Sequence, residues 1–406
     1  MQRDIAARKI IFDMDGVITS EECYWNMAAL VVWELLFSRR GLGLTAPPAL
    51  PSFTPVPDTA QVEAIRRAVF VQDRVIAFFK QRAVNSNWDL AFYTFAFQLA
   101  ALLNRFPAVT ALLAEEHLSG DNLTVEQLPR LGALLAARAQ APLQTDFEAI
   151  LTVGNALDRC ATGGCGQPPL QPFSGPDHNE AAGRGTVPLS QASPLWEGVR
   201  HVFQEWYFGE AGYRELYGQL PATRGKRGFI KTEEPLLPVE KIKETLRQLQ
   251  DRGWVLGAAT GRPRSELIPP LDQMGLLQYF DNTSLITFDQ VEQAQQVLAA
   301  AGETVFLGKP HPFSLLRAYW GSVYADKDLF YAPFPSPPPG SCWLVGDAPA
   351  DLLAARAAGV SFIAVRTGLA GAARQDLFAG MGAAAVLPDM THLPAFLADL
   401  AQQRQP

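Results

Sequence analysis

Cysteine, histidine and basic residues are scarce in this chain of 406 residues. It has four cysteines and five histidines, and its 34 Lys and Arg residues are outnumbered by 41 Asp and Glu residues, for a net charge of −7. A chain of this length buries enough apolar surface to fold without disulfide bonds. Cys160 and Cys165 flank Ala-Thr-Gly-Gly with no second pair nearby, which favours a glycine-rich loop over a metal site. The acidic balance gives no reason to expect nucleic acid or an anionic membrane as a partner.

Long hydrophobic runs are also lacking. The first apolar run leads directly into Asp13 and Asp15, which is not the pattern of a signal peptide. The apolar segment Met27–Phe37 is too short to span a bilayer and contains Glu34. Together with the low cysteine content, these features predict a soluble, cytoplasmic protein.

The hydrophobic pattern changes twice along the chain. Lys9-Ile-Ile-Phe12 is a short apolar run that stops at a polar loop, as expected of a buried parallel strand. From about residue 20 to 235 apolar residues recur at helical spacing. The segments with this spacing are 61–84, 88–105, 124–138 and 145–158. After residue 236 strand and helix patterns alternate, which predicts a parallel sheet covered by helices on both faces.

We therefore predict an α/β fold in which residues 1–19 and 236–406 form one core. Residues 20–235 would be a mostly helical module inserted after the first strand. Within it, residues 41–57 and 160–195 are rich in Gly and Pro and are expected to be loops or insertions. Ligands of open parallel sheets bind beyond the carboxyl ends of the strands, so polar residues at those ends are the candidates for a site.

Two such polar segments contribute carboxylates. Asp13 and Asp15 follow the first strand, and Gly16 permits a tight turn there. Asp347 and Asp351 follow the strand predicted at residues 342–345. Taken alone, the first pair could belong to a turn or to half of a calcium loop, and the second pair could belong to a helix N-cap.

Two further segments contribute phosphate-binding chemistry. Thr260-Gly-Arg262 follows the strand predicted at residues 254–259 and offers a hydroxyl, a free N–H and a cation, which suit phosphate oxygens. Lys309 precedes a predicted helix in the loop Gly-Lys-Pro-His-Pro. Each alone could be ordinary loop chemistry, but the occurrence of all four segments in this order favours a functional site.

The four segments resemble the four motifs of the haloacid dehalogenase-like hydrolases. They are Asp13-Met-Asp-Gly-Val17, Thr260-Gly-Arg262, Lys309-Pro310 and Gly346-Asp-Ala-Pro-Ala-Asp351, and the stretch Leu344–Gly368 is similar to the final core segment of that family. The resemblance covers residues 8–19 and 236–390. It implies a Rossmann-like core with the module as a C1-type helical cap. The sequence departs from the commonest pattern at Arg262, where Asn or Ser often stands, and at Ser20-Glu-Glu22.

The resemblance also implies a mechanism. Asp13 would be the nucleophile that forms an aspartyl-phosphate, and Asp15 would be the general acid and base. Thr260, Gly261 and Arg262 would bind phosphate oxygens. Lys309 would balance the charge of the nucleophile and hold a further oxygen.

Mg²⁺ is the cofactor that the resemblance implies, because hard oxygen ligands and a phosphate suit it. Its expected ligands are Asp13, the backbone carbonyl of Asp15, and Asp347. Asp351 would be either a ligand or a partner of Lys309.

The inserted module supplies the candidates for substrate recognition. Glu21, Glu22, Tyr24 and Trp25 directly follow the catalytic loop and could line the pocket. Alternatively, Tyr24 and Trp25 begin the helix that runs to Phe37 and pack inside the module.

Aspartate at position 15 suits a leaving alcohol that must be protonated, which argues against the dehalogenase and cation-pump branches of the family. The leading hypothesis is therefore a magnesium-dependent phosphatase acting on a small phosphorylated metabolite. A sugar phosphomutase of the same fold is the alternative. A non-catalytic binding module is a third hypothesis, disfavoured because all four motifs are intact.

Overall fold

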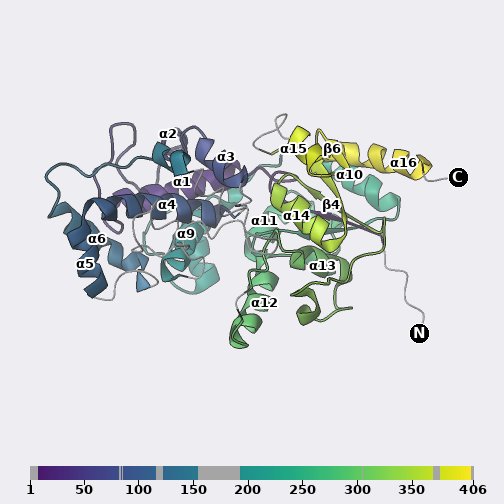
Figure 1. Cartoon of the computed structure of the whole chain (residues 1–406). Coiled ribbons are helices and arrows are strands. Elements are labelled where there is room, and N and C mark those ends of the chain that lie inside the picture. Colours follow the sequence, from purple (N-terminus) through teal and green to yellow (C-terminus); the bar gives the residue numbers. More distant parts are fainter. Residues whose placement is uncertain are drawn as a thin grey trace. The chain divides into compact units, whose positions relative to one another are not determined.

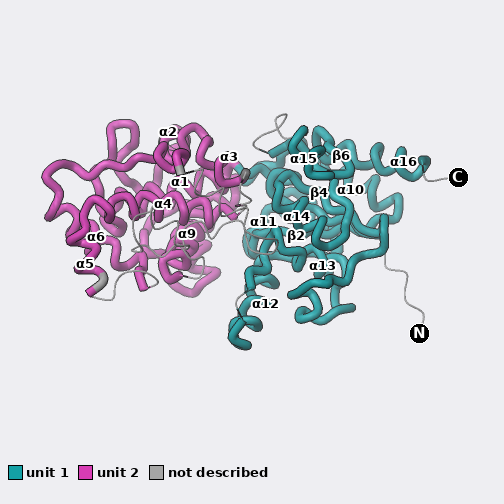
Figure 2. The backbone as a smooth tube through the Cα atoms, in the orientation of Figure 1, with its two compact units in different colours: residues 1–21, 233–406 teal, residues 22–232 magenta. Residues whose placement is uncertain are grey.

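The computed structural model describes residues 8–81, 84, 86–115, 122–153, 193–303, 305–368 and 375–403. Figure 1 shows the whole chain, and Figure 2 colours its two compact units: residues 1–21 with 233–406, and residues 22–232. We call these the core unit and the helical unit. Their bounds differ by two or three residues from the division predicted at 19 and 236. Cys160, Cys165 and nearly all of the predicted loop 160–195 lie outside the described residues.

The described residues of the core unit form a six-stranded sheet in the order β3-β2-β1-β4-β5-β6. All neighbouring strands are parallel, as predicted. The strands are β1 (Lys9–Phe12), β2 (Val255–Ala259), β3 (Leu285–Ile286), β4 (Cys342–Gly346), β5 (Ser361–Val365) and β6 (Ala385–Leu387). Because β1 lies between β2 and β4, its carboxyl end is flanked by the carboxyl ends of both neighbours.

Helices cover both faces of this sheet. They are α10 (Val239–Asp251), α11 (Arg264–Gln273), α12 (Phe288–Ala300), α13 (Phe313–Trp320), α14 (Pro349–Ala358), α15 (Gln375–Gly380) and α16 (Leu393–Gln403). One buried cluster joins α10, α11 and α16 to one face of the sheet. A second cluster joins α12, α13, α14 and α15 to the opposite face. The sheet is therefore the middle layer of three.

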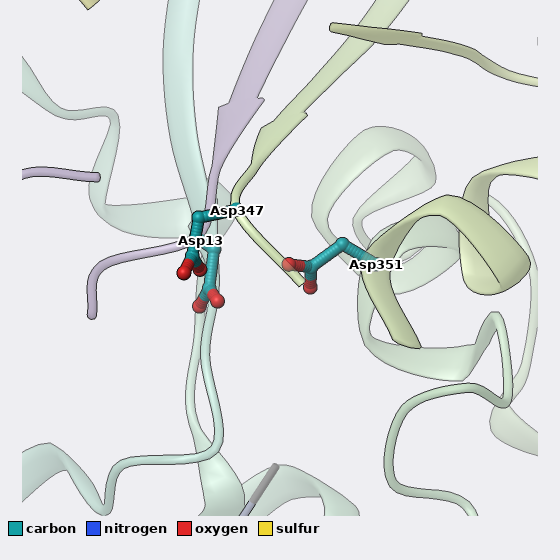
Figure 3. A group of neighbouring side chains, drawn as sticks. All are labelled: Asp13, Asp347 and Asp351. Atoms are coloured by element: carbon teal, nitrogen blue, oxygen red, sulfur yellow. The ribbon is translucent and has the colours of Figure 1, made fainter. Parts of the chain in front are cut away.

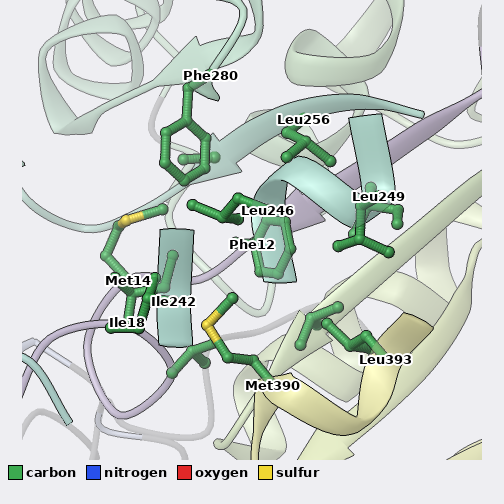
Figure 4. Packing of buried hydrophobic residues seen from close by; sticks show 14 of the residues in the cluster. Phe12, Met14, Ile18, Ile242, Leu246, Leu249, Leu256, Phe280, Met390 and Leu393 are labelled. Atoms are coloured by element: carbon green, nitrogen blue, oxygen red, sulfur yellow. The ribbon is translucent and has the colours of Figure 1, made fainter. Parts of the chain in front are cut away.

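Alternation along β1 explains how both faces are filled. Ile10 and Phe12 belong to the first cluster, and Ile11 between them belongs to the second, since successive side chains of a strand point to opposite faces. Helix α10 packs against Phe12 (Figure 4). Its residues Ile242, Leu246 and Leu249 recur at the spacing of one helical face. Complete burial of one such side chain stabilises the fold by about 1.5–3 kcal/mol.

The helical unit is built around α1, which is buried along almost its whole length. Its helices are α1 (Glu22–Phe37), α2 (Thr59–Val69), α3 (Arg74–Gln81), α4 (Asn87–Arg105), α5 (Pro107–Glu115), α6 (Leu128–Ala136) and α9 (Pro194–Tyr217). Helix α1 contacts α2, α4 and α9. A helix that is apolar on all sides is expected at the centre of a bundle, because every side has to be covered.

The helix predicted over residues 61–84 is broken in the structure. Val71, Gln72 and Asp73 adopt positive φ angles of 49°, 55° and 65° and separate α2 from α3. This conformation is unfavourable for residues other than glycine. Tertiary contacts support it here, because Asp73 accepts hydrogen bonds from Nε and Nη2 of Arg66 at 3.0 and 2.7 Å.

Two other predicted helices are shorter than expected. The segment predicted at 124–138 opens with a 3₁₀ turn and continues as α6, ending at residue 136. The segment predicted at 145–158 contains a 3₁₀ helix at Glu148–Val153, and residues 154–158 lie outside the described residues. In the part of the chain that the structure describes, no single helix is long and apolar enough to cross a membrane, although the bent pair Asn87–Arg105 and Pro107–Leu113 meets that test jointly.

Two short segments of the core unit mark where the chain leaves it and returns. Thr19 and Pro235 form an antiparallel bridge, and the Ser20 N–H donates to the carbonyl of Glu234 at 2.8 Å. These contacts bring the loop that follows β1 next to the segment that begins at Glu233.

Candidate active site

Three buried carboxylates meet at the carboxyl edge of the sheet. Asp13 follows β1 and Asp347 follows β4, and the parallel register pairs Phe12 with Val345, so the two aspartates leave the sheet side by side. Figure 3 shows the Asp351 carboxylate reaching toward them from α14. One oxygen of each of the three lies within 4.8 Å of the others. The sequence predicted this gathering of Asp13, Asp347 and Asp351.

Lys309 lies against two of these carboxylates. Its Nζ is 3.0 Å from Oδ1 of Asp13 and 2.7 Å from Oδ1 of Asp351. The ammonium group stands in a loop in which the Lys309–Pro310 peptide bond is cis. The next residue, His311, supports this loop: its N–H donates to the Gly308 carbonyl, and its Nε2 lies 3.1 Å from the carbonyl oxygen of Phe330.

Burial and charge act in opposite directions on this cluster. Burial raises the pKa of Asp13 to about 7; Lys309 opposes the rise, while Asp351 and Asp15 add to it. Burial also disfavours the charge of Lys309, but Asp13 and Asp351 outweigh it and raise the pKa of the ammonium above its usual range. In the absence of further positive charge, the Asp13 carboxyl is thus divided between its neutral and ionised forms near neutral pH.

The carboxylates fit a hard divalent cation. Three carboxylates facing one ammonium group carry an excess of negative charge, and carboxylate oxygens are the ligands that Mg²⁺ prefers. Glycines leave room for them. A Cβ at Gly16 would lie 2.5 Å from Oδ2 of Asp347, a Cβ at Gly346 would lie 2.5 Å from Oδ2 of Asp351, and one at Gly368 would overlap Oδ2 of Asp347.

Thr260 and Gly261 stand at the end of the neighbouring strand. Thr260 follows β2 and is buried, and its N–H donates to the Ile286 carbonyl at 3.1 Å. Gly261 is exposed, and a Cβ built there would meet no atom within 4 Å. The hydroxyl and the open backbone therefore lie at the same sheet edge as Asp13, since β1 and β2 are parallel neighbours.

Arg262 is turned toward the second aspartate of the first motif. Its Nε donates to Oδ2 of Asp15 at 3.0 Å, and its Nη1 donates to both carboxylate oxygens of Glu233 at 2.9 and 2.7 Å. The predicted role of Arg262 as a phosphate ligand stays a prediction. Sequence reasoning missed Glu233, which lies in a short connecting segment without periodic pattern and gains its partner only through the fold.

The four candidate substrate residues lie in different surroundings. Glu21 is buried in the core unit, whereas Glu22 begins α1, is exposed and pairs with Arg66 at 2.8 Å. Tyr24 is buried and packs against two aromatic rings of α9. Trp25 is buried with the Arg66 guanidinium 4.9 Å from its ring centroid. Their role toward a substrate stays a prediction.

A family model described as haloacid dehalogenase-like hydrolase matches residues 8–359. The chain belongs to this family. A solved relative supports the fold: an X-ray structure from the Northeast Structural Genomics Consortium superimposes with a TM-score of 0.67 at 27% identity, covering 98% of this chain and 100% of the other.

The curated proteins that this chain resembles include phosphatases. The plasmid-encoded phosphoglycolate phosphatase of Cupriavidus necator is 30% identical over 156 residues, which are 38% of this chain and 54% of that protein. The phosphoglycolate phosphatase of Yersinia pseudotuberculosis is 28% identical over 188 residues, which are 46% of this chain and 63% of that protein. The matches thus span less than two thirds of either relative.

Proposed function

We propose that this hydrolase-family member cleaves a small phosphate monoester through an aspartyl-phosphate on Asp13. The observation that carries the proposal is the buried grouping of Asp13, Asp347 and Lys309 at the carboxyl edge of the sheet. Such a group neutralises a phosphoryl oxyanion next to a carboxylate nucleophile, which is what phosphoryl transfer requires.

In the first step, an oxygen of Asp13 attacks phosphorus and the P–O bond to the alcohol breaks. Asp15 gives its proton to the leaving oxygen. The Thr260 hydroxyl, the Gly261 N–H and the Lys309 ammonium hold the phosphoryl oxygens. Lys309 also favours the ionised, nucleophilic form of Asp13, against the effect of burial.

A bound Mg²⁺ would neutralise the charge that develops on the phosphoryl oxygens. Asp13, Asp347 and the backbone carbonyl of Asp15 would hold it. The 2.7 Å contact between Asp351 and Lys309 favours the partner role for Asp351, although its distance to the other carboxylates also suits a ligand.

In the second step, Asp15 takes a proton from water, and the water attacks the phosphorus of the aspartyl-phosphate. The bond from phosphorus to Asp13 breaks, inorganic phosphate leaves, and both carboxylates return to their starting states. The two aspartates thus share the work as nucleophile and as acid and base.

Phosphoglycolate is the first substrate to test, because the curated relatives that match are named for its hydrolysis. The matches to those relatives span only part of their length, so the identity of the leaving alcohol is still to be determined. A panel of phosphomonoesters, with phosphoglycolate and p-nitrophenyl phosphate at its head, would establish the substrate class.

The full chain should be assayed for phosphate release with Mg²⁺ and with a chelator. We expect activity only with the metal, a loss of about 10⁴-fold or more in Asp13→Asn, and no change in the control Asp272→Asn on the exposed side of α11. Activity that survives Asp13→Asn would refute the nucleophile. Isomerised sugar phosphate in place of free phosphate would indicate the mutase instead.

A further inference from the structure

A buried arginine stands between the proposed acid–base residue and a second acidic side chain. The Arg262 side chain is 2% exposed, and that of Glu233 is 1% exposed. Arg262 donates from Nε and Nη2 to the Asp15 carboxylate and from Nη1 to Glu233. All three residues belong to the core unit and come from three separate segments of the chain.

The donors of this guanidinium are fully engaged by protein acceptors. Besides Asp15, Nη2 donates to Oγ1 of Thr19 at 3.0 Å, and besides Glu233, Nη1 lies 3.4 Å from the Glu266 carbonyl oxygen. A guanidinium has five N–H donors in a fixed plane, and the contacts named here account for them. In this arrangement Arg262 has no donor left for a phosphate oxygen.

The two carboxylates differ in what they can do. The side chain of Asp15 is 18% exposed and follows the nucleophile by two residues, so it can meet a substrate. Glu233 is enclosed. A charge enclosed in this way is tolerated only with a close partner, and Arg262 is such a partner. Glu233 therefore fixes one edge of the guanidinium while the other edge faces Asp15.

We propose that Arg262 is a positioning residue for Asp15, and that Glu233 holds Arg262 in place; this inference rests on the proposed function. The planar fork fixes the plane of the Asp15 carboxylate as a point charge could not. Proton donation to a leaving oxygen needs that orientation, because a general acid acts only within hydrogen-bond reach of the atom it protonates.

A positioning role predicts a dependence on the leaving group. An alkyl alcohol leaves only if it is protonated, so hydrolysis of phosphoglycolate depends on a well-placed Asp15. The p-nitrophenolate ion leaves without a proton, so kcat/KM for p-nitrophenyl phosphate depends on Asp15 much less. A direct phosphate contact of Arg262 would serve both esters alike, since both carry the same phosphoryl group.

The test compares kcat/KM of the full chain for these two esters. We expect Arg262→Met to lose about 10²–10³-fold with phosphoglycolate and less than about tenfold with p-nitrophenyl phosphate. Glu233→Gln should show the same pattern with a smaller loss. Arg262→Lys, which keeps the charge without the fork, should fall between wild type and Arg262→Met. Arg264→Met, two residues away and exposed, should match wild type.

Two further variants keep the test decisive. Arg262→Met removes the guanidinium that pairs with the buried Glu233, so the double variant Arg262→Met/Glu233→Gln serves if the single one does not fold, as judged by its thermal transition. Arg262→Met should cost little more in a chain that already carries Asp15→Asn, because residues that act through one another are not additive.

Equal losses with both esters, or a rise in KM alone, would overturn the positioning role and leave the proposed function standing. If wild type hydrolyses neither ester nor any other of the panel, the proposed function and this inference both fail. If wild type hydrolyses both esters, Asp13→Asn hydrolyses neither and Arg262→Met shows the leaving-group dependence, both stand.

Discussion

Replacing Gly16 by alanine should weaken metal binding in addition to straining the fold. A Cβ at this position would lie 2.5 Å from Cγ and Oδ2 of Asp347, and ordinary contact begins at about 3.4 Å, so the carboxylate has to move by roughly 0.9 Å. Ligand distances in metal sites are held within about 0.2 Å. We therefore expect the affinity for a divalent cation to fall at least about tenfold, the lower end of what displaced supporting groups cost.

The same substitution also strains the backbone, because Gly16 has a φ of +77°. A residue with a Cβ is less stable there by about 1–2 kcal/mol. In a domain of this size that lowers the melting temperature by roughly 2–8 °C. This second effect has to be separated from the loss of metal affinity.

Gly302 provides the matched control. Its φ is +78°, and a Cβ there would meet no atom within 4 Å, so Gly302→Ala carries the strain without the contact. Mn²⁺ binding, followed by calorimetry alongside thermal unfolding, should show a similar loss of stability in both variants and weaker binding in Gly16→Ala alone. If Gly16→Ala binds Mn²⁺ as tightly as Gly302→Ala, the proposed role of Asp347 as a ligand is wrong.

Two other expectations concern buried charge. Lys226→Met should lower the free energy of unfolding by about 3–5 kcal/mol, because Lys226 lies 2.7 Å from Glu34 and 2.6 Å from Glu205, both buried. In urea denaturation, the control Lys231→Met at an exposed position should lower this free energy by less than about 0.5 kcal/mol. Equal losses of stability in the two variants would contradict the expectation. Burial raises the pKa of Asp13 to about 7 from 3.8, so the folded, metal-free protein keeps a proton that the unfolded chain loses. The stability this proton provides is present below about pH 4 and is lost as the pH rises through about 7. The free energy of unfolding, measured in a chelator at pH 5 and 7.5, should fall with pH in wild type and fall less in Asp13→Asn. The same fall in both proteins would refute the raised pKa of Asp13.

The core of the fold and its carboxylates were predictable because their signals are local. The strand predicted at 254–259 is observed at Val255–Ala259, since an apolar run bounded by polar turns marks a buried strand. Asp13 and Asp347 could be placed together because parallel neighbours end at the same sheet edge. The alternation of strands and helices predicted a parallel sheet, but the strand order comes from the structure.

Side-chain direction was beyond the sequence. Arg262 follows Thr260 in a motif that suits phosphate, yet its partners come from residues 15 and 233, and only the fold brings them together. The break between α2 and α3 was equally hidden, because Val71-Gln-Asp73 contains neither glycine nor proline and depends on Arg66 for support. Both features arise from tertiary contacts that overrule local preference.

The most direct test is to look for phosphate attached to Asp13. Rapid acid quench of the full chain with ³²P-labelled phosphoglycolate and Mg²⁺, or with whichever ester of the panel it hydrolyses, should trap label on the protein. Borohydride reduction should then convert residue 13 to homoserine, and Asp13→Asn should retain no label. Turnover of the ester by wild type without any label on residue 13 would contradict the account.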